Sequence, residues 1–162
     1  MKPQTAVDIC NLALNKIGEP SIKVLDGNGG KREKACWKHY DACRRAALQA
    51  RGWGFAAASA DLNGSGEGGG KALVAHTLPA DCVRVGRCSS GEYRLTGRTL
   101  YSRETVVRLH YVRDVTEVRE MSALFVDALA TLLAVKLSEA LQGASKERAA
   151  LQARYNELVR VR

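Results

Sequence analysis

The hydrophobic pattern is densest between Met121 and Gly143, where apolar residues cover most of an expected helix surface. A helix that is apolar on most sides is usually buried among other elements. Ser122 is placed to cap the start of this helix, and Gly143 is placed to end it in a left-handed conformation. Its broadest face is formed by Leu124, Phe125, Ala128, Leu129, Leu132 and Val135. The rest of the chain must therefore supply partners for this helix.

A membrane span is the rival interpretation of the same segment. Asp127, Lys136 and Glu139 interrupt it, and the uncharged run between the first two is only eight residues long. A membrane-spanning helix needs roughly 20 mostly apolar residues. We therefore expect a buried helix and no membrane contact.

Helical spacing of apolar positions predicts three further helices, over Thr5 to Ile17, Lys31 to Arg51 and Lys146 to Val159. Thr5 and Asp8 form a capping pair at the start of the first, and Gly18 and Pro20 end it. Ser145 is placed to cap the last.

The pattern changes to short β-rich runs from about Lys71 and returns to helical spacing near Thr116. The clearest expected strand is Val106 to Val112, and Thr96-Gly97 lies at the tip of an expected hairpin. Ala56 to Leu62 fits either a strand or a loose turn. Four or five short strands are predicted in total, with turn signals between them.

These elements predict a mainly α fold with a β insertion (α+β), in which a four-helix bundle core carries a small antiparallel β-subdomain between its second and third helices. The whole chain, 1–162, is expected to be one domain. Its expected parts are a helical core (1–55 and 116–162), an inserted β-subdomain (71–115) and a flexible Gly-rich loop (63–70).

The segment between the second helix and the strands places two aromatic residues between glycines. Trp53 and Phe55 are expected to be buried against the bundle. Gly52 or Gly54 is expected to take a conformation that bulkier residues resist.

The chain has 162 residues with 25 Lys and Arg against 17 Asp and Glu, a net charge of +8. A basic balance is compatible with nucleic acid or with an acidic protein surface. The N-terminus has no apolar signal-like region, and the cysteine count is odd, at five. We therefore expect reduced thiols and no disulfide framework.

Several letter patterns suggest sites that their context does not support. Cys36, His39 and Cys43, with Cys10, could offer zinc ligands, but their spacing matches no usual zinc site. Cys82, Cys88 and His76 are no better placed, and the loop at Asp26-x-Asn28 lacks the glycine and glutamate of a calcium loop. The spacing of Gly64, Gly66 and Gly69 matches the glycine pattern of a dinucleotide-binding site, but no helix is expected directly after it, as such a site requires. No nucleophile elbow or catalytic grouping is present, so we predict no metal, no cofactor and no enzyme activity.

The second helix has an apolar stripe of Cys36, Tyr40, Cys43 and Ala47 and an opposite side rich in cations. The cationic residues proposed as a partner-binding surface are Lys31, Arg32, Lys34, Lys38, Arg44 and Arg45. Such a face is either simply solvated or a docking surface for acidic protein or DNA phosphates. A nucleic-acid-binding protein that uses Lys31 to Arg51 is the alternative function; base-specific readout has no support.

Short motifs in a fixed order resemble the tail tubular protein A family of tailed phages, which are head–tail adaptor (connector, gatekeeper) proteins. The first is Ile17-Gly18-Glu19-Pro20 after the first helix, and the second is Arg51-Gly52-Trp53-Gly54-Phe55 after the next. Leu78-Pro79 and Tyr111-Val112-Arg113-Asp114 follow in order, and two helices end the chain. Gly18, Pro20, Gly52, Trp53 and Phe55 are therefore the structural motif residues that the resemblance marks.

The resemblance implies a virion neck or tail protein of a short-tailed bacteriophage or prophage, present in the host cytoplasm before assembly. It implies a homo-oligomeric ring, of about twelve copies, that sits on the portal protein and receives the tail tube or nozzle protein. DNA would pass through the channel without sequence-specific binding. In two respects the chain departs from the family, since its β region is short and it has no long tail after the last helix.

Overall fold

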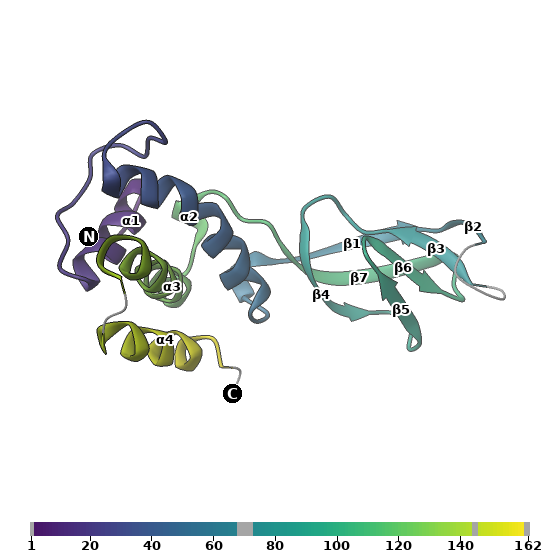
Figure 1. Cartoon of the computed structure of the whole chain (residues 1–162). Helices are drawn as coiled ribbons and strands as arrows, with labels where there is room; N and C mark the ends of the chain where they lie inside the picture. The colour runs from purple at the N-terminus through teal and green to yellow at the C-terminus, as the bar shows by residue number, and fades with distance from the viewer. Residues whose placement is uncertain (1, 68–72, 144–145, 161–162) are drawn as a thin grey trace. The chain divides into compact units, whose positions relative to one another are not determined.

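The computed structural model describes residues 2–67, 73–143 and 146–160. Helices lie at both ends of the chain and strands lie between them (Figure 1). The helices in these ranges are α1 (Ala6–Lys16), α2 (Lys31–Gln49), α3 (Ala123–Gln142) and α4 (Lys146–Leu158), with short 3₁₀ turns at Gly54–Ala56 and Val118–Glu120.

Local sequence signals set the ends of α1 as predicted. Thr5 and Asp8 form a reciprocal capping box, in which the Asp8 amide donates to Thr5 Oγ1 at 3.3 Å and the Thr5 amide donates to Asp8 Oδ2 at 3.1 Å. Gly18 follows the helix with a φ of +74°, and the Glu19 amide donates back to the Leu14 carbonyl at 2.9 Å. Glycine adopts such a φ without a steric cost, which explains the sharp stop before the exposed Pro20.

Helix α3 is the buried element that its sequence predicts. Ser122 caps it by accepting a hydrogen bond from the Phe125 amide, and Gly143 ends it with a φ of +70°. Twelve of its residues are buried. Leu124 is the exception, because this leucine was expected on the broad apolar face and is 44 % exposed in the first turn.

The expected four-helix bundle is wrong, because the helices meet in pairs, each with α3 as one member, and do not form a single bundle. Helix α3 packs against α2, against α4 and against α1, while α1 and α2 contact each other only slightly. The physical reason lies in the breadth of the apolar surface of α3, which can bury a different partner on each side. The periodicity of the sequence shows that each helix has an apolar face, but it does not show which helices pack against each other.

Residues 52–114 form a β unit with two antiparallel sheets, larger than the small subdomain of four or five strands that was expected. The described strands of one sheet run in the order β1-β7-β4, and those of the other run β2-β3-β6-β5. Their bounds are β1 (Ala57–Asn63), β2 (Ser65–Glu67), β3 (Val74–Thr77), β4 (Cys82–Cys88), β5 (Tyr93–Thr96), β6 (Thr99–Ser102) and β7 (Val106–Arg113).

The β unit has its own core, with β7 at the centre of one sheet. β7 pairs with β1 from Ala57 opposite Val112 to Asn63 opposite Val106, and with β4 on its other side. The buried residues of this core are Leu62, Leu78, Cys82, Leu100, Val107, Leu109 and Tyr111. The predicted hairpin is confirmed, since Thr96 pairs with Thr99 around Gly97, which has a φ of +59°.

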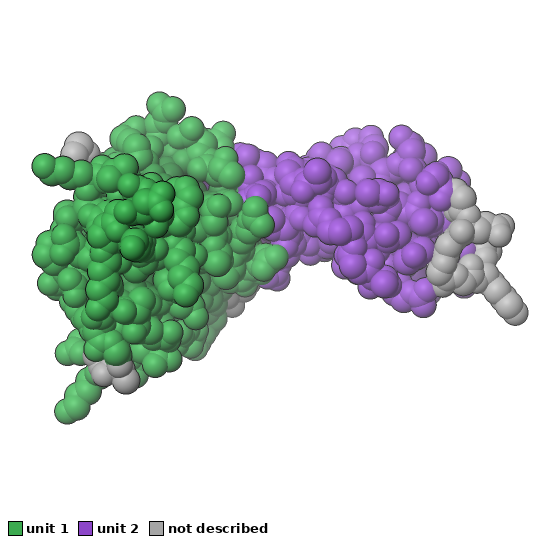
Figure 2. Space-filling model, turned by 45° about the horizontal axis from the view of Figure 1, so that its top comes forward, with its two compact units in different colours: residues 1–51, 115–162 green, residues 52–114 purple. Residues whose placement is uncertain are grey.

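The chain divides into two compact units, one of residues 1–51 and 115–162 and one of residues 52–114 (Figure 2). The strand-forming region thus begins earlier than Lys71, because Ala57–Asn63 is a strand. Within the expected loop 63–70, Ser65–Glu67 pairs as β2. Asn63 is the last residue of β1, while residues 68–70 of that loop, Lys71 and the expected cap Ser145 lie outside the described residues.

Candidate docking face on helix α2

The structure does not bring all six predicted basic residues onto one surface. Lys31, Lys34, Lys38 and Arg45 are exposed, and Arg32 is half-buried. Arg44 is buried, with only 2 % of its surface exposed. The predicted stripe of Cys36, Tyr40, Cys43 and Ala47 is confirmed as the buried side of α2.

Arg44 is a packing residue of the helical unit and not part of a docking surface. Its Nη1 donates to the Val115 carbonyl at 2.9 Å, and its Nε lies 3.4 Å from Asp41 Oδ1. A buried guanidinium is tolerated only when its donors find acceptors, which this carbonyl provides. The Arg44 position therefore ties α2 to the chain segment just before α3.

An exposed tryptophan that sequence reasoning did not single out lies on the same helix. Trp37 is 59 % exposed, the largest exposed fraction among the large hydrophobic residues described as exposed. Helical spacing places Lys34, Trp37, Lys38, Asp41 and Arg45 along one side. All five are exposed, and together we call them the Trp37 face.

Gly27 of the preceding loop lies against the Trp37 indole. A Cβ added to Gly27 would come within 2.9 Å of the indole Cδ1 and Nε1 atoms, closer than such contacts normally occur. Glycine at this position lets the loop backbone approach the ring directly. One edge of the indole is therefore covered while much of the ring stays in solvent.

The Trp37 face is electropositive. It carries three cations, Lys34, Lys38 and Arg45, against the single carboxylate of Asp41. Neighbouring His39 adds no charge at neutral pH, because burial and then the positive charges of Lys38 and Lys136 lower its pKa below the ordinary histidine value. An aromatic ring among cations is chemically suited to docking and not to bond-making.

The cysteine-centred candidates lie inside the two cores. Cys10, Cys36 and Cys43 are buried in the helical unit, Cys82 is buried in the β unit, and Cys88 is half-buried. Within 2–67, 73–143 and 146–160, no group of three or more His, Cys, Asp and Glu side chains is arranged to hold a metal ion. All five cysteines are free thiols.

We expect the five thiols to differ sharply in alkylation by iodoacetamide at neutral pH. The hydrogen bond with Cys36 and burial raise the pKa of Cys10, burial raises that of Cys43 to about 11, and burial raises that of Cys82. Cys88 is the one thiol that is not buried, so it should be labelled first and the other four only on unfolding. Cys36 is included among these four because it is 0 % exposed, although its hydrogen bond with Cys10 lowers its pKa. Peptide mass spectrometry reports the order, and a Cys88→Ser variant should lose the fast phase. Rapid labelling of two or more sites in that variant would contradict this account.

The expected burial of Trp53 and Phe55 is confirmed for Trp53 alone, and both residues belong to the β unit and not to the helical unit against which they were expected to pack. Trp53 is buried at 4 % exposure, while Phe55 is half-buried, and their ring centroids lie 6.2 Å apart at a tilt of 50°. The expected special backbone at Gly52 or Gly54 is wrong. Neither glycine has a positive φ, and a Cβ at either would meet nothing within 4 Å.

No family model matches this chain, and no curated protein matches it. Among the described helices, none combines the length and the apolar content that crossing a bilayer requires.

Proposed function

We propose that this chain is a structural head–tail connector protein of a short-tailed phage or prophage, and that the Trp37 face is one of its docking surfaces. The observation that carries the proposal is the exposed Trp37 among Lys34, Lys38 and Arg45 on a helix whose opposite side is buried. The ordered motifs of the sequence, from Gly18-Glu19-Pro20 to Tyr111-Val112-Arg113-Asp114, supply the family to which this surface would belong.

The energetics of association support this use of the Trp37 face. Tryptophan and arginine are the residues most enriched among interface positions that dominate binding energy. Gly27 restricts the indole before any partner arrives, so less side-chain freedom is lost on binding. The three cations would speed the approach of an acidic surface and set its register.

In this proposal the copies form a homo-oligomeric ring between the portal protein and the tail tube or nozzle protein. A ring requires a head-to-tail interface, in which two different surfaces of each copy meet. DNA would cross the channel through backbone charge alone, without reading its sequence. The protein would reside in the virion neck, and in the host cytoplasm before assembly.

Replacing Trp37 with alanine should weaken assembly by about 30-fold or more, the effect of losing an interface residue worth at least about 2 kcal/mol. Analytical ultracentrifugation of the purified chain, alone and with purified portal rings, measures the effect. Tyr93→Ala, which removes an aromatic residue of 39 % exposure from β5, is the matched control. Equal assembly by both variants would contradict the role of the Trp37 face, and failure of the wild type to bind portals would contradict the connector function itself.

A nucleic-acid-binding protein is the second candidate, and Trp37 beside Lys34 and Lys38 is the observation that favours it. An exposed aromatic ring flanked by cations can stack on a base while the cations meet phosphates. Fluorescence anisotropy with labelled single-stranded and duplex DNA over a salt series distinguishes the two functions. Tight wild-type binding at physiological salt, lost in Trp37→Ala while portal assembly persists, would replace the connector proposal for this face.

A further inference from the structure

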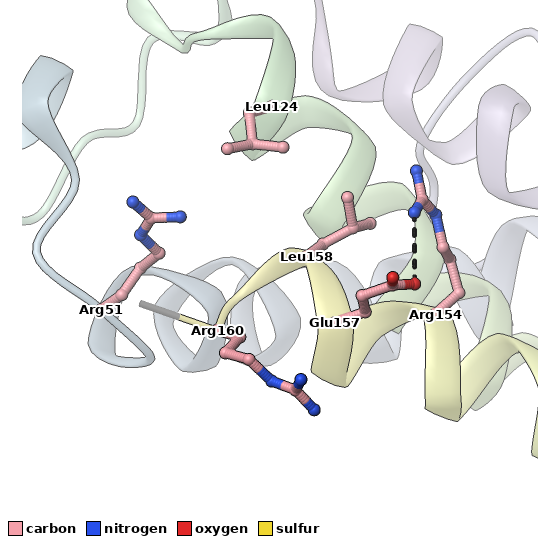
Figure 3. A pocket seen from close by; sticks show the side chains of 6 residues that line it. All are labelled: Arg51, Leu124, Arg154, Glu157, Leu158 and Arg160. Atoms are coloured by element: carbon pink, nitrogen blue, oxygen red, sulfur yellow. Dashed lines mark hydrogen bonds and ion pairs between the residues drawn. The ribbon is translucent and has the colours of Figure 1, made fainter. Parts of the chain in front are cut away.

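A second surface feature lies in the helical unit, at the ends of three helices. It is a pocket of about 330 Å³. Residues that line it come from the chain just after α2, the first turn of α3, the last part of α4 and the chain just after α4. They are Arg51, Leu124, Arg154, Glu157, Leu158 and Arg160 (Figure 3). The pocket shares no residue with the Trp37 face.

The floor of the pocket is apolar. Leu124 is 44 % exposed there, on a helix that buries four of its other leucines, and Leu158 lies beside it. In Figure 3 the two leucines lie between Arg51 on one side and the Arg154–Glu157 pair on the other. A leucine left this exposed at the end of a buried helix offers an apolar contact to another molecule.

The rim of the pocket is positive. Arg154 lies 3.5 Å from Glu157 and 3.6 Å from Asp127, so the one carboxylate among the lining residues already has a cation partner. Among the lining residues three arginines stand against one glutamate, although the Arg160 guanidinium points outward. The second carboxylate near Arg154, Asp127, is also paired with Lys16 at 3.3 Å. The first turn of α3 contains no acidic residue, and the positive end of the helix dipole adds to the same potential.

We propose that this pocket docks a segment of a partner protein in which an apolar side chain is adjacent to one or more carboxylates. The apolar side chain would cover Leu124 and Leu158, and the carboxylate would accept hydrogen bonds from Arg51 or Arg154. A second copy of this chain is the poorer occupant, because each copy carries a net charge of +8. The partner must be acidic where the chain is basic.

A random linear peptide library displayed on particles tests this without assuming a sequence. The wild-type chain is the bait, and the Arg51→Gln/Leu124→Ser double variant is used for counter-selection. The proposal expects enriched peptides that combine an apolar residue with neighbouring Asp or Glu and that fail to bind the double variant. Enrichment of basic or purely polar peptides, or no difference between the two baits, would overturn it.

Single variants then assign the contacts, by fluorescence anisotropy with the enriched peptide. Arg51→Gln and Leu124→Ser should each weaken binding about tenfold, as expected for one lost charge-assisted or apolar contact. Arg148→Gln, an α4 arginine paired with Glu139 outside the pocket, and Leu12→Ser, a 39 % exposed leucine on α1, are the matched controls and should stay within about twofold of wild type. Circular dichroism melts confirm that each variant is folded.

Duplex DNA is the competing ligand for a basic pocket. If unlabelled DNA displaces the peptide at physiological salt, and Arg51→Gln weakens DNA binding while Leu124→Ser does not, the pocket binds phosphates and the protein-partner proposal is wrong. Failure of the portal experiment above leaves this test untouched, since it uses different residues and no portal protein.

Discussion

Reversing the charge of Arg44 by substitution with glutamate should lower the free energy of unfolding by about 3–5 kcal/mol, as expected when a buried charge loses its compensation. Arg44 is 2 % exposed and donates to the Val115 carbonyl. A glutamate there would place a carboxylate against that carbonyl and would also lie next to Asp41. Denaturant melts followed by far-UV circular dichroism measure the loss.

The adjacent residue provides the control. Arg45 is exposed on the Trp37 face, so Arg45→Glu should change the free energy of unfolding by no more than about 0.5 kcal/mol. The same substitution at neighbouring positions thus separates a structural arginine from a surface one. Equal melts for the two variants would mean that the Arg44 side chain leaves its buried position in solution.

Replacing Trp53 with alanine should cost about 3–5 kcal/mol, the usual range for truncating a buried large aromatic residue. Trp53 is 4 % exposed, and its ring lies 6.2 Å from that of Phe55. Loss of the indole removes a large apolar contact and leaves a cavity that neighbouring side chains fill only in part. Equilibrium unfolding in denaturant gives the value.

Trp37→Ala is the matched substitution, because Trp37 is 59 % exposed and should contribute little to stability. The chain has two tryptophans, so each variant also leaves a single fluorescent reporter. Emission from Trp53 should be blue-shifted and protected from acrylamide, and emission from Trp37 should be quenched readily. A cost below about 1 kcal/mol for Trp53→Ala, or easy quenching of its emission, would contradict the burial of Trp53.

The features that could be predicted from sequence are those set by neighbouring residues. The Thr5–Asp8 capping box, the Ser122 cap, the stop at Gly18 and the turn at Gly97 each depend on positions only a few residues apart. The interactions that stabilise these caps and turns are made within about one turn of the chain, so the residue types at those positions are enough to predict them.

The features that were missed or left open depend on contacts distant in sequence. Arg44 lies at the edge of an apolar stripe, and its acceptor at Val115 is 71 residues away. Ala57–Asn63 is rich in alanine and becomes a strand because β7 pairs with its full length. Trp37 is a different case, because helical spacing alone places it on the same side of α2 as the exposed cations. The exposed tryptophan could therefore have been predicted from the sequence together with the basic residues.

The insertion of the β unit between α2 and α3 has a consequence for how the protein is made. Because β1 and β7 pair from Ala57 opposite Val112, the chain enters and leaves this unit at adjacent points. The described strands of both sheets all lie within residues 52–114. On the ribosome this middle segment can finish folding first. Helices α1 and α2 emerge earlier but pack mainly on α3, so their apolar stripes stay uncovered until synthesis has passed residue 142. We therefore expect the β unit to fold before the helical unit during synthesis, with the helices at the start of the chain as the part that a nascent-chain chaperone would shield.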